Sequence, residues 1–171
     1  MLMRSATAAD IPQMRVLETA APAAAHWGTE MYTRIFDPSG LSRLALVLEE
    51  GDKLWGFLVA LCAGPEWELE NIVVGEELRR RGWATRLIVE LLHRAQAAGA
   101  EAVFLEVRES NQPARALYRK TAFVKQGRKR GYYSDPSEDG IRLSRALQPQ
   151  QAKIRLAGDP VKNPSKPAES A

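Results

Sequence analysis

Three consecutive arginines precede a glycine near the middle of the chain, where a strand-like pattern gives way to a helix-like one. They are Arg79, Arg80 and Arg81, followed by Gly82 and, two positions on, Ala84. A helix N-terminus presents unpaired backbone N–H groups and the positive end of its dipole, so it binds anions such as phosphate. The two small residues let a ligand approach the backbone, and the arginines add charge. This pattern indicates a site for a diphosphate-bearing cofactor.

Two other phosphate-binding motifs do not fit this segment. The Walker loop ends in Gly-Lys-Ser/Thr, and the dinucleotide fingerprint needs three glycines. A solvated arginine cluster at the start of a surface helix agrees equally well with the spacing alone. Spacing therefore leaves both interpretations open.

The segments around the arginines switch between the two structural periods. Strand patterns cover residues 44–50, 53–62, 68–74, 102–108, 123–127 and 140–147. Helix patterns cover residues 8–20, 29–36, 76–99 and 111–122. Thr7 with Asp10 forms a capping box, Asn111 followed by Pro113 is a typical helix start, and Gly99 a typical helix end. The order predicts an α/β fold, a mixed sheet with helices on its faces.

Composition excludes several classes of protein. The chain has 171 residues, 45% of them hydrophobic, which is typical of one soluble domain. It contains no apolar run near the roughly 18 residues of a membrane helix, and its start does not resemble a signal peptide. The single cysteine, Cys62, is expected to be a buried small hydrophobe. We expect a cytoplasmic protein without a metal and without a membrane partner.

The net charge of +3 is unevenly distributed. Residues 148–171 are rich in Gln, Pro, Ala and Ser and carry two of these charges. They have little to bury, so we expect a disordered tail after a domain at 1–147. The near-neutral domain argues against a nucleic-acid partner, although the pI is near 9.2.

Four segments together resemble the GNAT N-acetyltransferases, in particular the RimI branch that acetylates a ribosomal protein's α-amine. The motif R-x-x-G-x-A of this family is Arg79-x-x-Gly82-x-Ala84. The others are ELENIVV at 68–74, LEVRESNQPARALY at 105–118, and GYYSDPSEDG at 131–140. The resemblance covers residues 4–147 and implies a GNAT fold: a mostly antiparallel sheet, flanked by helices, whose strands 68–74 and 102–108 splay apart.

The resemblance also implies a cofactor site and catalytic roles. Acetyl-coenzyme A would lie in the splay, and Asn111 would contact it. Its thioester would lie beside Ile72, Val73 and Val74, and its diphosphate at Arg79, Arg80, Arg81, Gly82, Trp83, Ala84 and Thr85. Glu106 matches the family's general base and Tyr118 its general acid. A backbone N–H near Val73 and Val74 would meet the oxyanion.

Amide formation explains why these residue types are needed. An α-amine with a pKa of about 7.7 to 8.0 must lose a proton before it attacks a thioester, and a carboxylate can accept that proton. A tyrosine with a pKa of about 10 stays protonated and can donate to the leaving thiolate. Glu68 and Glu70 are competing bases. In the alternative without a catalytic role, Glu106 pairs with Arg108 on its own strand.

Several choices stay open at this level. Tyr118 could be packing on a helix face. Tyr132 and Tyr133 match the family's pair at the peptide site, but simple aromatic packing fits equally. Ala122 stands where relatives usually have glycine, and residues 21–42, where acceptor choice would be set, are the least similar.

The expected activity is direct acetyl transfer to a protein N-terminus, in particular the N-terminal alanine of ribosomal protein S18. A GNAT enzyme for a small amine or lysine and a non-catalytic acyl-CoA sensor are the alternatives. A ribosome- or RNA-binding module is disfavoured by the near-neutral domain. The oligomeric state is left undetermined by the sequence.

Overall fold

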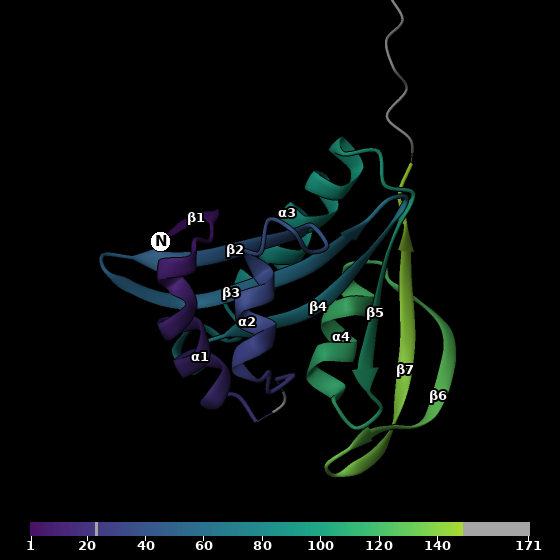
Figure 1. Cartoon of the computed structure of the whole chain (residues 1–171). Helices are drawn as coiled ribbons and strands as arrows, with labels where there is room; N and C mark the ends of the chain where they lie inside the picture. The colour runs from purple at the N-terminus through teal and green to yellow at the C-terminus, as the bar shows by residue number, and fades with distance from the viewer. Residues whose placement is uncertain (23, 149–171) are drawn as a thin grey trace, which may run out of the picture.

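The computed structural model of the chain describes residues 1–22 and 24–148. Within them, seven strands form one sheet in the order β1-β2-β3-β4-β5-β7-β6 (Figure 1). The strands are β1 Leu2–Ser5, β2 Arg43–Glu50, β3 Lys53–Ala63, β4 Glu66–Val74, β5 Ala102–Arg108, β6 Val124–Ser134 and β7 Ser137–Ala146. All neighbours are antiparallel except β4 and β5. The predicted mixed, mostly antiparallel sheet is confirmed.

The parallel pair β4–β5 departs from the rest of the sheet. Its strands are in register only at Glu66–Ala102, Trp67–Val103 and Glu68–Phe104. Beyond Glu68 they diverge into a V, with α4 visible between them in Figure 1. The predicted splay is thereby confirmed. The backbone of β4 from Leu69 to Val74 consequently has sheet partners on β3 but no register with β5.

Helices cover both faces of the sheet. They are α1 Ile11–Thr19, α2 Thr29–Ile35, α3 Trp83–Ala97 and α4 Gln112–Lys120. One hydrophobic cluster packs α3 and α4 against the sheet, with Leu87, Leu91 and Leu105 among its buried members. The other packs α1 and α2 on the opposite face around Met14 and Tyr32. The sheet is therefore buried from both sides where helices lie over it.

The local start and stop signals decide where these helices lie. The Thr7–Asp10 capping box is present, but it opens a 3-10 turn at Ala8–Asp10 before α1 begins. Asn111 caps α4, and its side chain accepts the Ala114 N–H at 3.1 Å. Gly99 follows the end of α3 with a φ of +82°. Asn111 therefore marks the start of α4 and Gly99 the end of α3, whereas the capping box lies one turn before α1.

Four expectations need correction. Strand β1 was not predicted; it is a strand of 4 residues with only partly buried side chains. The expected helix 76–99 begins at Trp83, because a 3-10 turn at Glu76–Leu78 and a loop come first. The last strands run longer than predicted, and Cys62 is half-buried rather than buried. The predicted tail at 148–171 lies, apart from Gln148, outside the described residues.

Candidate active site

The start of α3 has the features of an anion site. Gly82 has a φ of +84°, the left-handed region that glycine adopts without steric cost, and a Cβ there would meet nothing within 4 Å. The first helical bond is Arg86 N–H to the Gly82 carbonyl at 3.0 Å. The N–H groups of Trp83, Ala84 and Thr85 are thus outside the helical ladder. Acidic residues are absent from this first turn, so its positive end is uncompensated.

The arginines ahead of this turn are exposed. Arg79 reaches back to β4, where its Nε donates to the Val74 carbonyl at 3.4 Å. Arg80 adopts a positive φ of 59°, and the loop turns there into Arg81 and Gly82. Three arginines and open backbone N–H groups thus follow one another in the chain at one helix start. The segment fits a diphosphate, as the sequence pattern predicts.

Glu106 lies at the centre of a charged group on the C-terminal strands. Its side chain is only 6% exposed. Its Oε1 accepts from Lys129 Nζ at 2.7 Å and from Arg142 Nη1 at 3.1 Å. Arg108 pairs with Glu138 instead, so the alternative of a Glu106–Arg108 pair is wrong. The two cations compensate a carboxylate that burial would otherwise penalise.

Glu68 lies beside Glu106 across the β4–β5 pair. Burial raises the pKa of the Glu68 carboxyl, and the nearby charges of Glu106 and Glu70 raise it further. The negative charge of Glu106 therefore makes ionisation of Glu68 less favourable. Glu70 is paired elsewhere, because Arg43 donates two hydrogen bonds of 2.7 and 3.1 Å to its carboxylate. We call Glu68, Glu106, Lys129 and Arg142 the carboxylate cluster.

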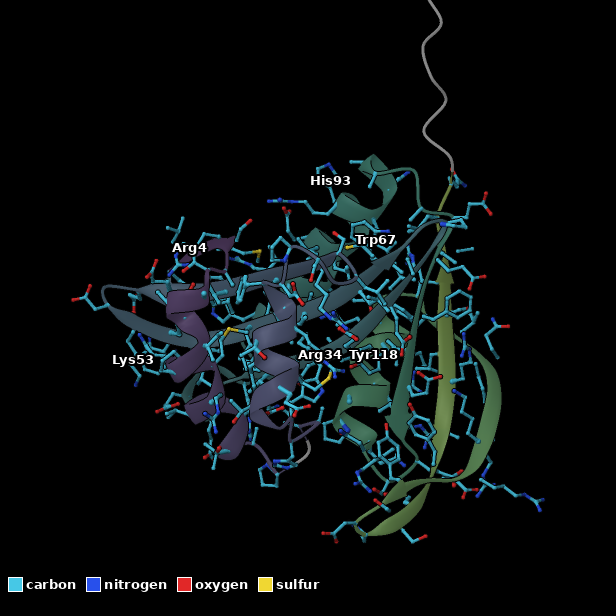
Figure 2. The ribbon with its side chains drawn as sticks, viewed as in Figure 1. Arg4, Arg34, Lys53, Trp67, His93 and Tyr118 are labelled. Carbon is cyan, nitrogen blue, oxygen red and sulfur yellow. The ribbon has the colours of Figure 1, made fainter. Side chains whose placement is uncertain are left out.

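Tyr118 lies on α4 where β4 and β5 diverge (Figure 2). The helix ends at Lys120, two residues later, in a Schellman motif: Phe123 N–H donates to the Tyr118 carbonyl at 2.9 Å, and Ala122 N–H donates to the Arg119 carbonyl at 3.0 Å. The Tyr118 and Phe123 rings pack edge to face at 5.8 Å. Burial raises the pKa of the Tyr118 phenol, and Tyr133 adds to the shift. Tyr118 therefore keeps its proton at neutral pH and is available as a donor.

Tyr132 and Tyr133 lie beside the carboxylate cluster. Their rings meet edge to face at 5.0 Å. Lys129 Nζ lies 4.9 Å from the Tyr132 ring, and the Arg108 guanidinium lies 4.2 Å from that of Tyr133. Burial raises the pKa of Tyr133 to about 12. Both tyrosines thus belong to the surroundings of Glu106 as well as packing on each other.

Asn111 caps a helix in addition to its predicted contact with the cofactor. Its Oδ1 caps α4, which leaves the amide nitrogen as the group able to contact a ligand. The loop around it is fixed by Glu138, which accepts from the Ser110 N–H and, at 2.9 Å, from the Ser110 hydroxyl. Arg108 donates to the Asp135 carbonyl at 2.7 Å. These bonds tie the β6–β7 turn to the end of β5.

A buried polar network joins the helices on the other face to β4. Glu18 accepts from the Trp27 N–H at 3.1 Å, the Tyr32 hydroxyl at 2.8 Å and Asn71 Nδ2 at 2.7 Å. Asn71 directly precedes Ile72, so the network fixes the strand where the thioester is expected. The sequence analysis did not single out Glu18. Its place four residues after the buried Met14, on the apolar face of α1, is the signal that could have found it.

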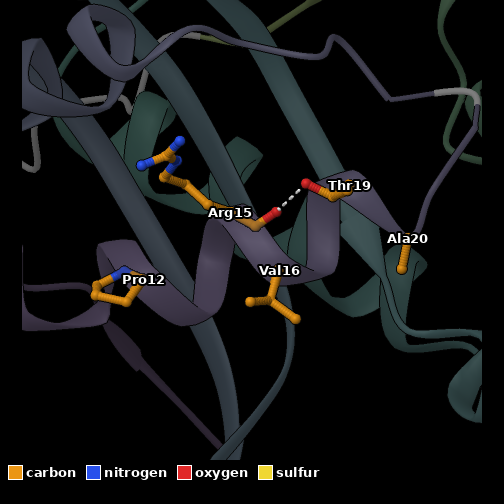
Figure 3. Close-up of a pocket in the computed structure, with 5 residues that line it drawn as sticks. All are labelled: Pro12, Arg15, Val16, Thr19 and Ala20. Atoms are coloured by element: carbon orange, nitrogen blue, oxygen red, sulfur yellow. Dashed lines mark hydrogen bonds between the residues drawn. The ribbon is translucent and has the colours of Figure 1, made fainter.

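A shallow pocket lies apart from these groups, on the exposed side of α1. Pro12, Arg15, Val16, Thr19 and Ala20 line it (Figure 3). The Thr19 hydroxyl donates to the Arg15 carbonyl at 2.9 Å. None of the predicted site residues borders this pocket. It has no part in the site described above.

Residues 1–22 and 24–148 contain no group of three or more His, Cys, Asp or Glu side chains placed to hold a metal ion. In the same ranges, no helix has the length and apolar character needed to cross a membrane.

Comparison with known families decides the class of the protein. Residues 11–123 match the acetyltransferase (GNAT) family. The chain belongs to the GNAT acetyltransferase family. It is therefore an acyltransferase, and the resemblance inferred from the four segments is confirmed.

Individual relatives of this GNAT chain are N-acetyltransferases. A [ribosomal protein bS18]-alanine N-acetyltransferase of Haemophilus ducreyi is 31% identical over 108 residues, which cover 63% of this chain and 73% of the relative. An N-alpha-acetyltransferase of Saccharolobus solfataricus is 44% identical over 78 residues, 45% of this chain and 46% of the relative. This chain is thus a GNAT N-acetyltransferase with relatives that act on α-amines.

A solved structure agrees in fold. The ribosomal-protein-S18-alanine N-acetyltransferase from Escherichia coli superposes with a TM-score of 0.75 at 24% identity, covering 88% of this chain and 97% of that one. At that identity the likeness establishes the fold, which is the GNAT fold expected from the sequence.

Proposed function

We propose that this enzyme transfers an acetyl group from acetyl-coenzyme A to the α-amine of a protein N-terminus. The observation that carries the proposal is the placement of Glu68 beside the buried Glu106 on β4 and β5, the two strands that splay apart. A carboxylate can accept a proton from the acceptor amine, and the buried phenol of Tyr118 on α4 can donate one. These are the acid–base roles that amide formation from a thioester needs. The direct reaction requires no covalent intermediate on the enzyme.

The co-substrate would be held by the α3 start and by β4. Backbone N–H groups at Trp83, Ala84 and Thr85 suit the diphosphate, with Arg79, Arg80 and Arg81 around them. The part of β4 that is not paired with β5 suits the pantetheine arm, with the thioester beside Ile72, Val73 and Val74. A β4 backbone N–H facing the splay would serve as a preformed donor to the oxyanion. Asn111 would contribute its amide nitrogen.

The acid–base steps would be divided between the carboxyl pair and Tyr118. Glu106 takes the proton from the acceptor ammonium, directly or through a water, and Glu68 shares the added proton. The raised pKa of Glu68 supports this, because a base is most effective when its pKa approaches the operating pH. Tyr118 donates to the departing thiolate. The buried phenol is protonated at neutral pH, so its O–H can donate a hydrogen bond to the sulfur as negative charge develops there.

The acceptor we propose is the N-terminal alanine of ribosomal protein S18. The support is the named activity of the Haemophilus relative at 31% identity. Tyr132 and Tyr133 would flank the acceptor backbone next to Glu106. A small amine or a lysine is the alternative acceptor class, and a sensor without turnover is the alternative to catalysis.

Mass spectrometry of acceptor peptides tests this assignment. We expect a gain of one acetyl group on a peptide with the S18 N-terminus and little on a peptide of the same composition in shuffled order. A free-amine panel run in parallel covers the alternative acceptors. Retained binding of acetyl-coenzyme A without any gain on the S18 peptide would refute the acceptor. No transfer to any amine would favour the sensor.

A further inference from the structure

The ammonium of Lys129 occupies a place at Glu106 that the proposed reaction reserves for an acceptor amine. Lys129 Nζ lies 2.7 Å from Glu106 Oε1. A general base acts on an amine within hydrogen-bond reach, and this pair meets that requirement. The side chain of Lys129 is 42% exposed, so the amine is also open to solvent on one side.

The irregular course of β6 places Lys129 there. The register of β6 with β7 shifts between Lys129 and Tyr133, and Gly131 turns with a φ of +59°. Asp139 fixes this bend by accepting the Gly131 N–H at 2.8 Å. The Tyr132 ring, brought back by the bend, lies 4.9 Å from Lys129 Nζ. The ammonium is thus held by the carboxylate and by the face of an aromatic ring.

Neutralising Glu106 does not by itself require Lys129. Arg142, on the strand opposite Glu106, donates to the same oxygen at 3.1 Å. An arginine stays charged and cannot act as an acceptor, whereas a lysine amine can lose a proton and attack a carbonyl. One oxygen of Glu106 thus contacts a permanent counter-ion, Arg142, and an amine, Lys129, that becomes a nucleophile once it loses a proton.

We propose that Lys129 is an internal acceptor, acetylated in cis by the enzyme's own site. This proposal rests on the proposed function. The Lys129 nitrogen forms a bond to the acetyl carbon as the carbon–sulfur bond of acetyl-coenzyme A breaks. Glu106 takes one proton from the ammonium and passes it to solvent. Tyr118 protonates the thiolate, and the second proton lost by the Lys129 nitrogen restores the Tyr118 phenol. The products are Nε-acetyl-Lys129, coenzyme A and one released proton.

Acetylation of Lys129 would occur once per chain and would change the cluster. The amide has no positive charge, so Glu106 would keep Arg142 alone as its counter-ion. The carboxylate oxygen facing Lys129 would then be available to the ammonium of an external acceptor.

Three lysines on one peptide make the test internally controlled. Cleavage after Glu109 and Glu138 releases residues 110–138, which contain Lys120, Lys125 and Lys129. Lys120 and Lys125 are exposed and report non-enzymatic acetylation. The full chain is incubated with acetyl-coenzyme A, and fragmentation of the peptide locates the label. Because Lys129 is held at the base, we expect its label to appear at least about tenfold faster than at either neighbour.

Variants and dilution decide the outcome. Glu106→Gln should reduce the Lys129 label to the level of Lys125, and Lys125→Arg, the matched control, should leave it unchanged. The rate per chain should not depend on enzyme concentration. Equal labelling of the three lysines, or a rate proportional to enzyme concentration, would overturn the proposal. A parallel S18 peptide assay separates the failures: peptide turnover without Lys129 preference refutes this inference alone, and absence of transfer to any amine refutes both.

Discussion

The proposed anion site at the start of α3 consists of consecutive residues, whereas the carboxylate cluster takes its side chains from four strands. Arg79 to Thr85 would act mainly through backbone N–H groups and a local turn at Gly82. Glu106, by contrast, depends on Lys129 and Arg142, which are 23 and 36 residues away in the sequence. A site made of backbone is specified by local sequence, and a site made of side chains by the register of the sheet.

Replacing the central carboxylate should produce the largest effect. Glu106→Gln keeps the size of the side chain but cannot accept the acceptor's proton, so we expect turnover to fall about 100-fold to 10,000-fold. Acetyl-coenzyme A affinity should stay nearly unchanged, because the α3 start is separate. Steady-state kinetics and calorimetric titration of the same sample measure both. A matched loss of cofactor affinity would show that the two regions are not independent.

The glycine at the start of α3 should affect binding of the co-substrate. Gly82→Ala places a Cβ at a φ of +84°, which costs about 1–2 kcal/mol and shifts the N–H groups of the first turn. We expect the KM for acetyl-coenzyme A to rise about tenfold with kcat nearly constant.

The other end of α3 offers a matched control for this variant. Gly99 has a φ of +82° and, like Gly82, open space where a Cβ would point. Gly99→Ala should lower stability comparably and leave the KM unchanged. Equal KM changes in both variants would mean that the effect comes from helix stability alone.

Glu68 should govern the acid side of the pH profile. The pKa of its carboxyl is raised by burial and by the charge of Glu106. Glu68 must be ionised to accept a share of the proton that Glu106 takes from the acceptor. We therefore expect kcat/KM to fall as the pH drops through this raised pKa. Glu68→Gln should lower kcat/KM severalfold and move the acid limb to lower pH, because the remaining carboxylate no longer has an acidic neighbour. An unchanged acid limb in the variant would show that a group other than Glu68 titrates there.

Ala122 should affect stability without affecting chemistry. It occupies the left-handed position of the Schellman motif after Tyr118, with a φ of 60° that glycine would adopt more readily. Ala122→Gly should raise the free energy of unfolding by about 1 kcal/mol, measured by denaturant titration, with kcat within about twofold. A larger change in kcat would show that the helix end tunes the position of Tyr118.

The contrast between the regions also explains what the sequence could predict. Strand β5 has the predicted bounds 102–108, and the capping role of Asn111 is confirmed, because alternation and caps are local signals. The pairing of Glu106 with Lys129 was missed, since it depends on the bend in β6 and on the order β5-β7-β6. Strand β1 was missed because four partly exposed residues give no clear alternation.

The choice of amine tests the central claim most directly. The test uses two peptides of the same sequence, which begins with alanine and contains one internal lysine. One peptide has a free N-terminus and the other a blocked one. Each is incubated with the enzyme and acetyl-coenzyme A, and transfer is measured by mass spectrometry. The account predicts one acetyl group on the α-amine of the free peptide and little gain on the blocked one. Equal acetylation of both peptides at the lysine would contradict it.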